Sequence, residues 1–156
     1  MNLFKMTYKD MSRAERTILI GTVIWILLQV FRLIAVVLIR DINDGLASEA
    51  WRYPAYLDLF AVVFAVPLIW AVCMHRGLLT WASLVVYWVI SIVDHVGNFV
   101  TTTFVGPPTI AKGIENPYLV PAIQTVFDVV FLLLLFFPVG RNLFFQLKVL
   151  PNREKE

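Results

Sequence analysis

The side chains able to carry acid–base or electrostatic chemistry stand inside long apolar runs rather than between them. The densest group is in the stretch VISIVDHVGNFV, which places Asp94, His95 and Asn98 within about two helical turns. A carboxyl beside an imidazole can act as a general acid–base pair, and histidine exchanges protons near neutral pH. The same groups can also bind a cation or pair with a neighbouring helix. Because ionisable groups in apolar segments are expensive, the stretch indicates a binding site or a structural ion pair.

Three other apolar segments carry polar residues, two of them at helical spacing. Gln29 and Arg32 are three residues apart, Gln124 and Asp128 are four apart, and Asp58 lies near the start of its segment. Side chains three or four residues apart share a helix face. If the segments alternate in direction, all these residues come to the same half of a helical bundle. The candidate ligand-binding residues are Arg32, Asp58, Asp94, His95, Asn98, Gln124 and Asp128.

The charges of this set do not cancel. One arginine faces three aspartates, which leaves a formal charge of 1 − 3 = −2 when His95 is neutral. We expect one buried pair, between Arg32 and Asp94, because their depths agree best. Asp58 is nearest the outer mouth of the bundle, where headgroup water can solvate it. The remaining carboxyls must be protonated, hydrated or matched by the positive charge of a ligand.

Composition places the chain among membrane proteins. Of its 156 residues, 60% are hydrophobic and 15% are charged, against roughly 45–50% and about 25% in soluble domains. The small net charge of +2 gives no indication of nucleic-acid binding. Cys73 is the single cysteine, which excludes an internal disulfide or a cysteine metal cluster. One histidine among scattered aspartates is not a zinc pattern, and His75 is placed at the opposite surface from His95, so we expect no metal and no cofactor.

Four apolar segments set the expected fold: residues 17–39, 56–74, 79–103 and 119–137. Each is long enough to cross a hydrocarbon core about 30 Å thick, and a helix satisfies its own backbone groups in lipid. We find no internal repeat, low-complexity tract or soluble domain. The sequence therefore predicts an all-α, four-transmembrane-helix bundle, with residues 1–156 forming a single integral membrane domain.

Lysine and arginine predict how this bundle is oriented. With four spans, nine of them share the side of both termini, three face the other side, and Arg32 lies within the first span. Since the more basic side is cytoplasmic, both termini are expected in the cytoplasm, and a bacterial inner membrane is the expected location. The candidate residues then lie in the outer half of the bundle. The nine are Lys5, Lys9, Arg13, Arg16, Arg76, Arg141, Lys148, Arg153 and Lys155, and the three are Arg40, Arg52 and Lys112.

The connections add two expectations. The short turn MHRGLL predicts that the second and third spans are antiparallel neighbours. After Pro138 and Gly140, the segment RNLFFQLKVL mixes aromatic with basic residues. Two interpretations stay open for this segment: a helix lying along the cytoplasmic lipid surface, or a frayed extension of the fourth span.

A resemblance to known membrane proteins is carried by three stretches: YPAYLDLFAVVFAVPLIWAV, VISIVDHVGNFV and NPYLVPAIQTVFDVVFLLLLF. They resemble small uncharacterised bacterial four-helix integral membrane proteins, which have an acid early in one span, an acid late in the next and Val-Pro opening another. That resemblance implies a fold and no activity. In its four spans, cytoplasmic ends and internal acids, the chain is also similar to the emopamil-binding, sigma-2-receptor-like (EXPERA) membrane domain. This second similarity implies that Asp58, Asp94, His95 and Asn98 line a ligand cavity.

The leading functional expectation is binding of a small amphipathic or cationic ligand in a polar pocket, with Asp94 and Asp128 as charge partners and Arg32 as organiser. Two alternatives stay open. One is a non-catalytic subunit of a larger membrane complex, whose buried charges pair across an interface. The other is an isomerase or proton-transfer enzyme that uses Asp94 and His95 on a lipid-like substrate. The expected partners are the lipid bilayer, the ligand, and a second copy or a membrane complex.

Overall fold

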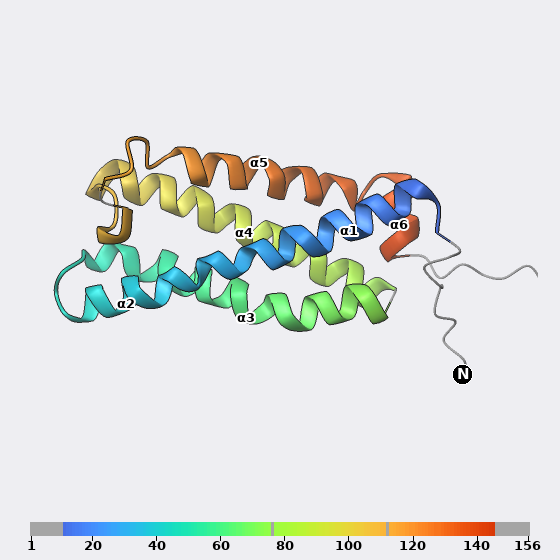
Figure 1. Cartoon of the computed structure of the whole chain (residues 1–156), viewed down its shortest axis with the longest axis horizontal. Coiled ribbons are helices and arrows are strands. Elements are labelled where there is room, and N and C mark those ends of the chain that lie inside the picture. The colour runs from blue at the N-terminus through green and yellow to red at the C-terminus, as the bar shows by residue number, and fades with distance from the viewer. Residues whose placement is uncertain (1–10, 76, 112, 146–156) are drawn as a thin grey trace, which may run out of the picture.

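Helices and the turns between them make up the computed structural model, which describes residues 11–75, 77–111 and 113–145 (Figure 1). Short 3₁₀ segments, η2 (Gln29–Ile34), η3 (Glu49–Trp51) and η4 (Thr109–Ala111), interrupt or connect the α-helices. No strand occurs in these ranges, so the predicted all-α fold is confirmed for them. The α-helices are α1 (Arg13–Leu28), α2 (Ala35–Asn43), α3 (Arg52–Met74), α4 (Leu78–Val105), α5 (Leu119–Leu134) and α6 (Pro138–Phe144).

Local signals set where the helices begin. A capping box opens α1: the Glu15 amide donates to Ser12 Oγ at 3.2 Å, and the Ser12 amide donates to Glu15 Oε2 at 2.8 Å. Gly77 precedes α4 with φ of 136°, a conformation that a Cβ atom disfavours. This glycine allows the chain to reverse sharply between α3 and α4.

Three helical stretches are long and apolar enough to cross a membrane. They are Arg13–Asn43, Glu49–Met74 and Leu78–Val105, of 31, 26 and 28 residues. The α5 helix has only 16 residues, so it makes a fourth candidate span only together with α6, from which it is bent by 78°. The predicted segments thus correspond to three or four candidate spans, and the last is shorter than expected.

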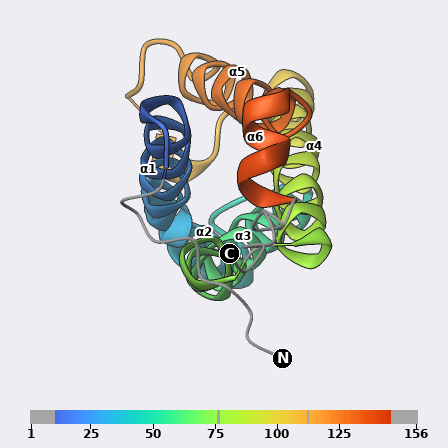
Figure 2. The same ribbon diagram turned by 90° about the vertical axis from the view of Figure 1, so that its right-hand side faces the viewer.

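The helices run side by side and alternate in direction (Figure 1). The start of α1, the α3–α4 turn and α6 lie at one end of the bundle, and the α2–α3 and α4–α5 connections lie at the other. Seen along the bundle, α1, α3, α4 and α5 surround the axis and α6 lies across one end (Figure 2). The predicted antiparallel packing of the second and third spans, α3 and α4, is confirmed.

Two apolar clusters fill the interior, one toward each end. The α6-side cluster joins α1, α3, α4 and α6 and includes Leu68, Leu84, Trp88 and Phe144. The loop-side cluster lies toward the other end and consists of Ala35, Leu38, Ile42, Trp51 and Ala55. In sequence, Gln29 and Arg32 of the first span and Asp58 of the second fall between members of these two clusters. The interior therefore has a polar layer with hydrocarbon on either side.

The segment after the fourth predicted span folds back into the bundle. Leu143 and Phe144 of α6 are fully buried in the α6-side cluster, and the Phe144 carbonyl accepts from the Gly77 amide at 2.9 Å. A Cβ atom on Gly140 would lie 1.9 Å from the Leu134 carbonyl oxygen, so the sharp bend requires glycine there. The frayed-extension interpretation is wrong for residues 141–145, because α6 bends by 78° from α5 and is packed. The lipid-surface interpretation stays a prediction, and the rest of the segment lies outside the described residues.

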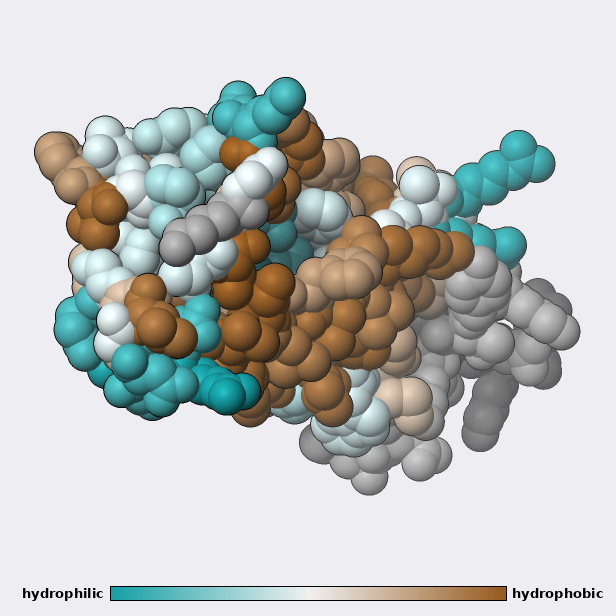
Figure 3. Space-filling model, turned by 60° about the vertical axis from the view of Figure 1, so that its left-hand side comes forward, coloured by the Kyte–Doolittle hydropathy of each residue, from teal (hydrophilic) through white to brown (hydrophobic). Residues whose placement is uncertain are grey.

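The outside of the helices is apolar. Large side chains such as Phe31, Val66 and Phe104 are mostly exposed, and Figure 3 shows apolar residues over the body of the bundle with polar residues gathered at the loop end. Exposed apolar surface on this scale is what a bilayer, rather than water, would cover. Of the nine basic residues predicted on one side, Arg13, Arg16 and Arg141 lie at the α6 end. Lys5, Lys9, Arg76, Lys148, Arg153 and Lys155 lie outside the described residues, as does Lys112.

Candidate functional site

Arg32 lies at the centre of the buried polar residues. Its Nη1 is 2.9 Å from Asp94 Oδ2 and 3.3 Å from Asp58 Oδ1, and its Nη2 is 3.8 Å from Asp128 Oδ2. The predicted Arg32–Asp94 pair is present. The structure adds that one guanidinium contacts all three aspartates, which come from α3, α4 and α5. We call Arg32 and its neighbours the polar layer: Trp25, Gln29, Arg32, Asp58, Ser91, Asp94, His95 and Asp128.

The 3₁₀ segment η2 presents Arg32 to this layer. A 3₁₀ helix has three residues per turn, so Gln29 and Arg32 lie directly above one another, and both are buried. Phe31 and Leu33, between and beside them, face outward. The sequence predicted a continuous α-helix here. The tighter local winding was missed, although the three-residue spacing of the two polar side chains is compatible with it.

Helix α4 supplies three neighbours of the guanidinium. Arg32 Nη2 donates to Ser91 Oγ at 2.6 Å and lies 2.6 Å from His95 Nε2, while Nη1 holds Asp94. Ser91, Asp94 and His95 are spaced three and four residues apart, which brings them to one helix face. The planar fork of Arg32 reaches both Asp94 and His95.

His95 lies between two carboxylates. An arginine can only donate, so its contact at 2.6 Å requires His95 Nε2 to accept and places the ring proton on Nδ1. The same Nε2 is 3.2 Å from Asp128 Oδ2, and Nδ1 is 4.0 Å from Asp94 Oδ2. Nε2 cannot accept from Arg32 and donate to Asp128 at the same time. The imidazole thus has two exclusive hydrogen-bonding arrangements.

Trp25 ties α1 to α5 through Asp128. Its indole N–H donates to Asp128 Oδ1 at 2.7 Å. The sequence analysis did not include Trp25 among the candidate site residues. The available signal was its position one turn before Gln29, on the face that carries Arg32.

Asp58 is the only accessible acid of the polar layer. Its side chain is 20% exposed, whereas those of Asp94 and Asp128 are 0% exposed. Its carboxylate also pairs with Arg32, a contact that the sequence analysis did not predict. It also reaches the Asp94 side chain.

Asn98 and Gln124 do not join the polar layer. Both are half-buried, and neither side chain makes a hydrogen bond with a described residue. Asn98 lies one turn beyond Asp94 toward the loop end, and Gln124 lies one turn before Asp128 on α5. The structure therefore brings five of the seven predicted site residues together: Arg32, Asp58, Asp94, His95 and Asp128.

The polar layer is short of positive charge and of hydrogen-bond donors. With His95 neutral and all three carboxyls counted as ionised, its formal charge is 1 − 3 = −2. Three buried oxygens have no donor among the described residues: Gln29 Oε1, Asp94 Oδ1 and Asp128 Oδ2. Arg32 Nε and His95 Nδ1 lack acceptors. Such buried unpaired groups are costly, and water or a ligand normally satisfies them. No group of three or more His, Cys, Asp or Glu in the described ranges is arranged to hold a metal ion.

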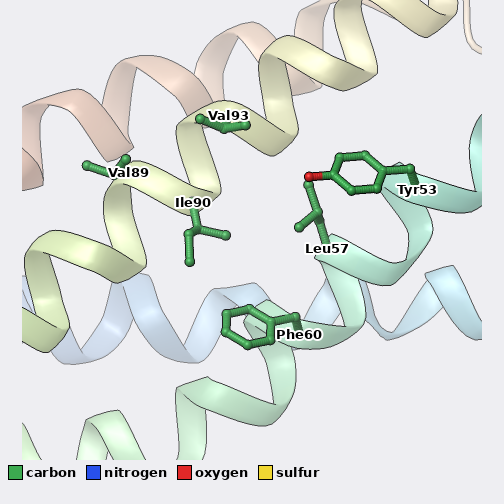
Figure 4. Close-up of a pocket in the computed structure, with 6 residues that line it drawn as sticks. All are labelled: Tyr53, Leu57, Phe60, Val89, Ile90 and Val93. Carbon is green, nitrogen blue, oxygen red and sulfur yellow. The ribbon is translucent and has the colours of Figure 1, made fainter.

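An apolar groove lies between α3 and α4 on the outer surface (Figure 4). It encloses about 340 Å³ and is lined by Tyr53, Leu57, Phe60, Val89, Ile90 and Val93. Leu57 precedes Asp58 and Val93 precedes Asp94, so the groove and two acids of the polar layer lie at one depth on adjacent faces of the same helices. Sequence reasoning did not find this groove, because it depends on how α3 and α4 pack.

Comparison of the chain with protein-family models, with curated proteins and with solved structures finds no match. Its function must be inferred from the polar layer and the groove.

Proposed function

We propose that this protein is a multi-pass membrane protein that binds a small amphipathic ligand with a positively charged head in the polar layer. The observation that carries the proposal is the charge of the layer: three buried or half-buried carboxylates surround one guanidinium. An alkylammonium head supplies both what the layer lacks, positive charge and N–H donors. An anionic ligand would instead add to the excess negative charge of the layer.

Each member of the layer has a role in this proposal. Asp94 and Asp128 are the charge partners of the head, since each has a buried oxygen without a donor. Arg32 holds the acids in position. Asp58, the accessible acid, makes the first contact. The ligand head thus passes from a partly exposed carboxylate to two fully buried ones.

We also propose the orientation with both termini in the cytoplasm and the polar layer in the outer half of the membrane. The distribution of lysine and arginine over the whole sequence supports it. The ligand would then arrive from the non-cytoplasmic side or from the outer leaflet. A bacterial inner membrane fits this orientation.

The test compares ligand binding by the full-length protein and by the Asp94→Asn/Asp128→Asn double variant. Decylamine is titrated calorimetrically into protein held in phosphatidylcholine nanodiscs, with the neutral decanol as a matched probe. We expect the double variant to bind decylamine roughly a hundredfold more weakly, since losing one partner of a buried charge contact costs about 2–5 kcal/mol. Asp44→Asn, which removes an exposed acid paired with Arg40, should leave binding unchanged. Unchanged binding by a folded double variant contradicts the proposal.

A second candidate function is proton transfer, and the position of His95 favours it. With Nδ1 facing Asp94 and Nε2 facing Asp128, the ring can accept a proton on one nitrogen as it releases one from the other. In the same titration, His95→Gln should keep most of the decylamine binding, because the carboxylates remain. ¹⁵N NMR of His95 separates the roles: a relay predicts exchange between both tautomers, and a ligand site with a fixed histidine predicts the Nδ1–H form alone.

A further inference from the structure

We propose that the groove between α3 and α4 holds the alkyl chain of the ligand, which reaches the polar layer sideways from the bilayer. This inference rests on the proposed function and names the ligand class: a single-chain alkyl amine. The chain would lie in the groove, and the ammonium would pass Asp58 to reach Asp94 and Asp128. The site is separate from the buried network and is formed by six other side chains.

The groove has the size and lining that an alkyl chain needs. Its volume of about 340 Å³ lies within the range of roughly 300–1,000 Å³ found for small-molecule sites. Five of its six side chains carry no polar atom, and the sixth is Tyr53. Figure 4 shows the Tyr53 hydroxyl reaching over Leu57 toward α4. The groove is therefore apolar along its length with one hydroxyl at its rim.

The groove is open to lipid. Val93 is 53% exposed, and Tyr53 and Val89 are also exposed. These residues belong to the apolar outer surface of the bundle, so hydrocarbon rather than water is their natural surrounding. A chain already dissolved in the bilayer can move into the groove without crossing water.

Charge complementarity identifies the head. Asp58 follows Leu57 on α3, so its side chain emerges about 100° around the helix from the groove wall. It is the one partly exposed carboxylate of the polar layer, and behind it the layer carries a formal charge of −2. A cation at Asp58 is attracted by this charge, while an anionic headgroup is repelled. The head of the occupant is accordingly cationic.

The test maps where the chain lies. A decylamine carrying a diazirine in the middle of its chain is photo-crosslinked to the full-length protein in phosphatidylcholine nanodiscs, and the modified residues are found by mass spectrometry. We expect labels on α3 between Tyr53 and Phe60 and on α4 between Val89 and Val93. Val93→Trp, which fills the groove, should weaken decylamine binding at least about tenfold, the equivalent of losing the burial of two methylenes.

A matched control and the contrary outcomes complete the design. Val66→Trp places the same indole on an exposed α3 position outside the groove and should leave binding unchanged. If decylamine binds but labels residues elsewhere, or if Val93→Trp has no effect, the groove proposal is wrong while the polar-layer function stands. If decanol that carries the same diazirine labels the groove as strongly as the decylamine probe, the groove is ordinary lipid-facing surface and the proposal fails. If decylamine does not bind the wild-type chain, the proposed function itself fails.

Discussion

Arg32 holds together side chains from three other helices. Its two terminal nitrogens contact three aspartates, a serine and a histidine. A planar guanidinium with five N–H donors can serve this many acceptors, whereas a lysine ammonium is a single point with three donors. The carboxylates around it are stable in an apolar interior only while this charge is present. Arg32 is thus the residue on which the polar layer depends.

Removing the guanidinium should therefore be far more harmful than removing an exposed one. Arg32→Met is expected to lower the free energy of unfolding by about 3–5 kcal/mol, because it leaves buried carboxylates uncompensated. The Arg32→Met/Asp94→Asn double variant should recover part of this loss, with a coupling of roughly 0.5–3 kcal/mol. Unfolding in detergent by denaturant titration measures both effects.

The matched control is Arg40→Met, since Arg40 is 81% exposed and its ion pair with Asp44 spans 3.6 Å. Exposed pairs of this kind contribute about 0–1 kcal/mol. Equal losses for the Arg32 and Arg40 variants would show that the polar layer does not depend on Arg32 as described.

Depth along the spans predicted part of this arrangement. Arg32 and Asp94 were expected as a pair because a straight helix advances about 1.5 Å per residue, so sequence position gives depth. Depth says little about rotation around each helix axis. The indole donor of Trp25 and the accepting role of Asp58 depend on rotation, and they were missed for that reason. Asn98 and Gln124 were included because each lies one turn from an aspartate of the layer, but their side chains do not reach it.

The short helix α6 packs closely against the end of the bundle. It turns back by 78° after α5 and buries Leu143 and Phe144 among residues of α1, α3 and α4. The Phe144 carbonyl of α6 accepts from the Gly77 amide at 2.9 Å. In the link between α5 and α6, the Leu135 carbonyl accepts from the Trp81 indole, also at 2.9 Å. The helix thereby fixes the α3–α4 turn as well as closing the end of the bundle.

A methyl group at Gly140 should dislodge this helix. Gly140→Ala would place Cβ 1.9 Å from a backbone oxygen of Leu134, and backbone cannot give way by that much. If α6 leaves its place, the burial of Leu143 and Phe144 is lost, at about 1.5–3 kcal/mol for each side chain. Thermal unfolding in detergent should show a clear loss of stability.

Gly97→Ala provides the control, because a Cβ there meets nothing within 4 Å. Within α4, alanine is favoured over glycine by about 0.8–1.0 kcal/mol, so this variant should be unchanged or slightly more stable. A Gly140→Ala protein as stable as the Gly97→Ala protein would mean that α6 is not packed as the structure has it.

The existence and approximate length of the long helices were predictable, because uninterrupted apolar runs admit few other structures in lipid. The way in which α6 folds back against the bundle was not predictable from the sequence. Its segment has the composition of a lipid-surface helix, and the contact that decides its place is between Gly140 and a backbone atom of α5. Such a contact has no counterpart in the pattern of the sequence.

Across the molecule as a whole, the polar layer lies between two apolar clusters and joins all four long helices. In lipid, little hydrophobic force drives helices together, so specific contacts must fix how they pair. A shift of one helix by a turn would move an acid away from Arg32 and into hydrocarbon. The layer therefore sets the vertical register of the bundle.

The proposed orientation can be read from the single cysteine. Cys73 is exposed near the end of α3, at the α6 end of the bundle. In intact bacterial cells, a membrane-impermeant maleimide should not label it, whereas lysed cells should be labelled. Glu115→Cys in a Cys73→Ser background, which places a thiol in the α4–α5 loop, should show the opposite. Labelling of Cys73 in intact cells would reverse the orientation.

The position of Arg32 in the first long helix also bears on how the protein is made. Its partners Asp94 and Ser91 follow 62 and 59 residues later, and Asp128 is made later still. During synthesis, the leading helix thus meets the bilayer with an arginine that disfavours insertion by about 2.5–3.5 kcal/mol. Asp58 is the first acid to emerge that can compensate it. The early helices should accordingly wait at the insertion machinery and enter lipid as a pair, which makes the order of synthesis part of how the fold is reached.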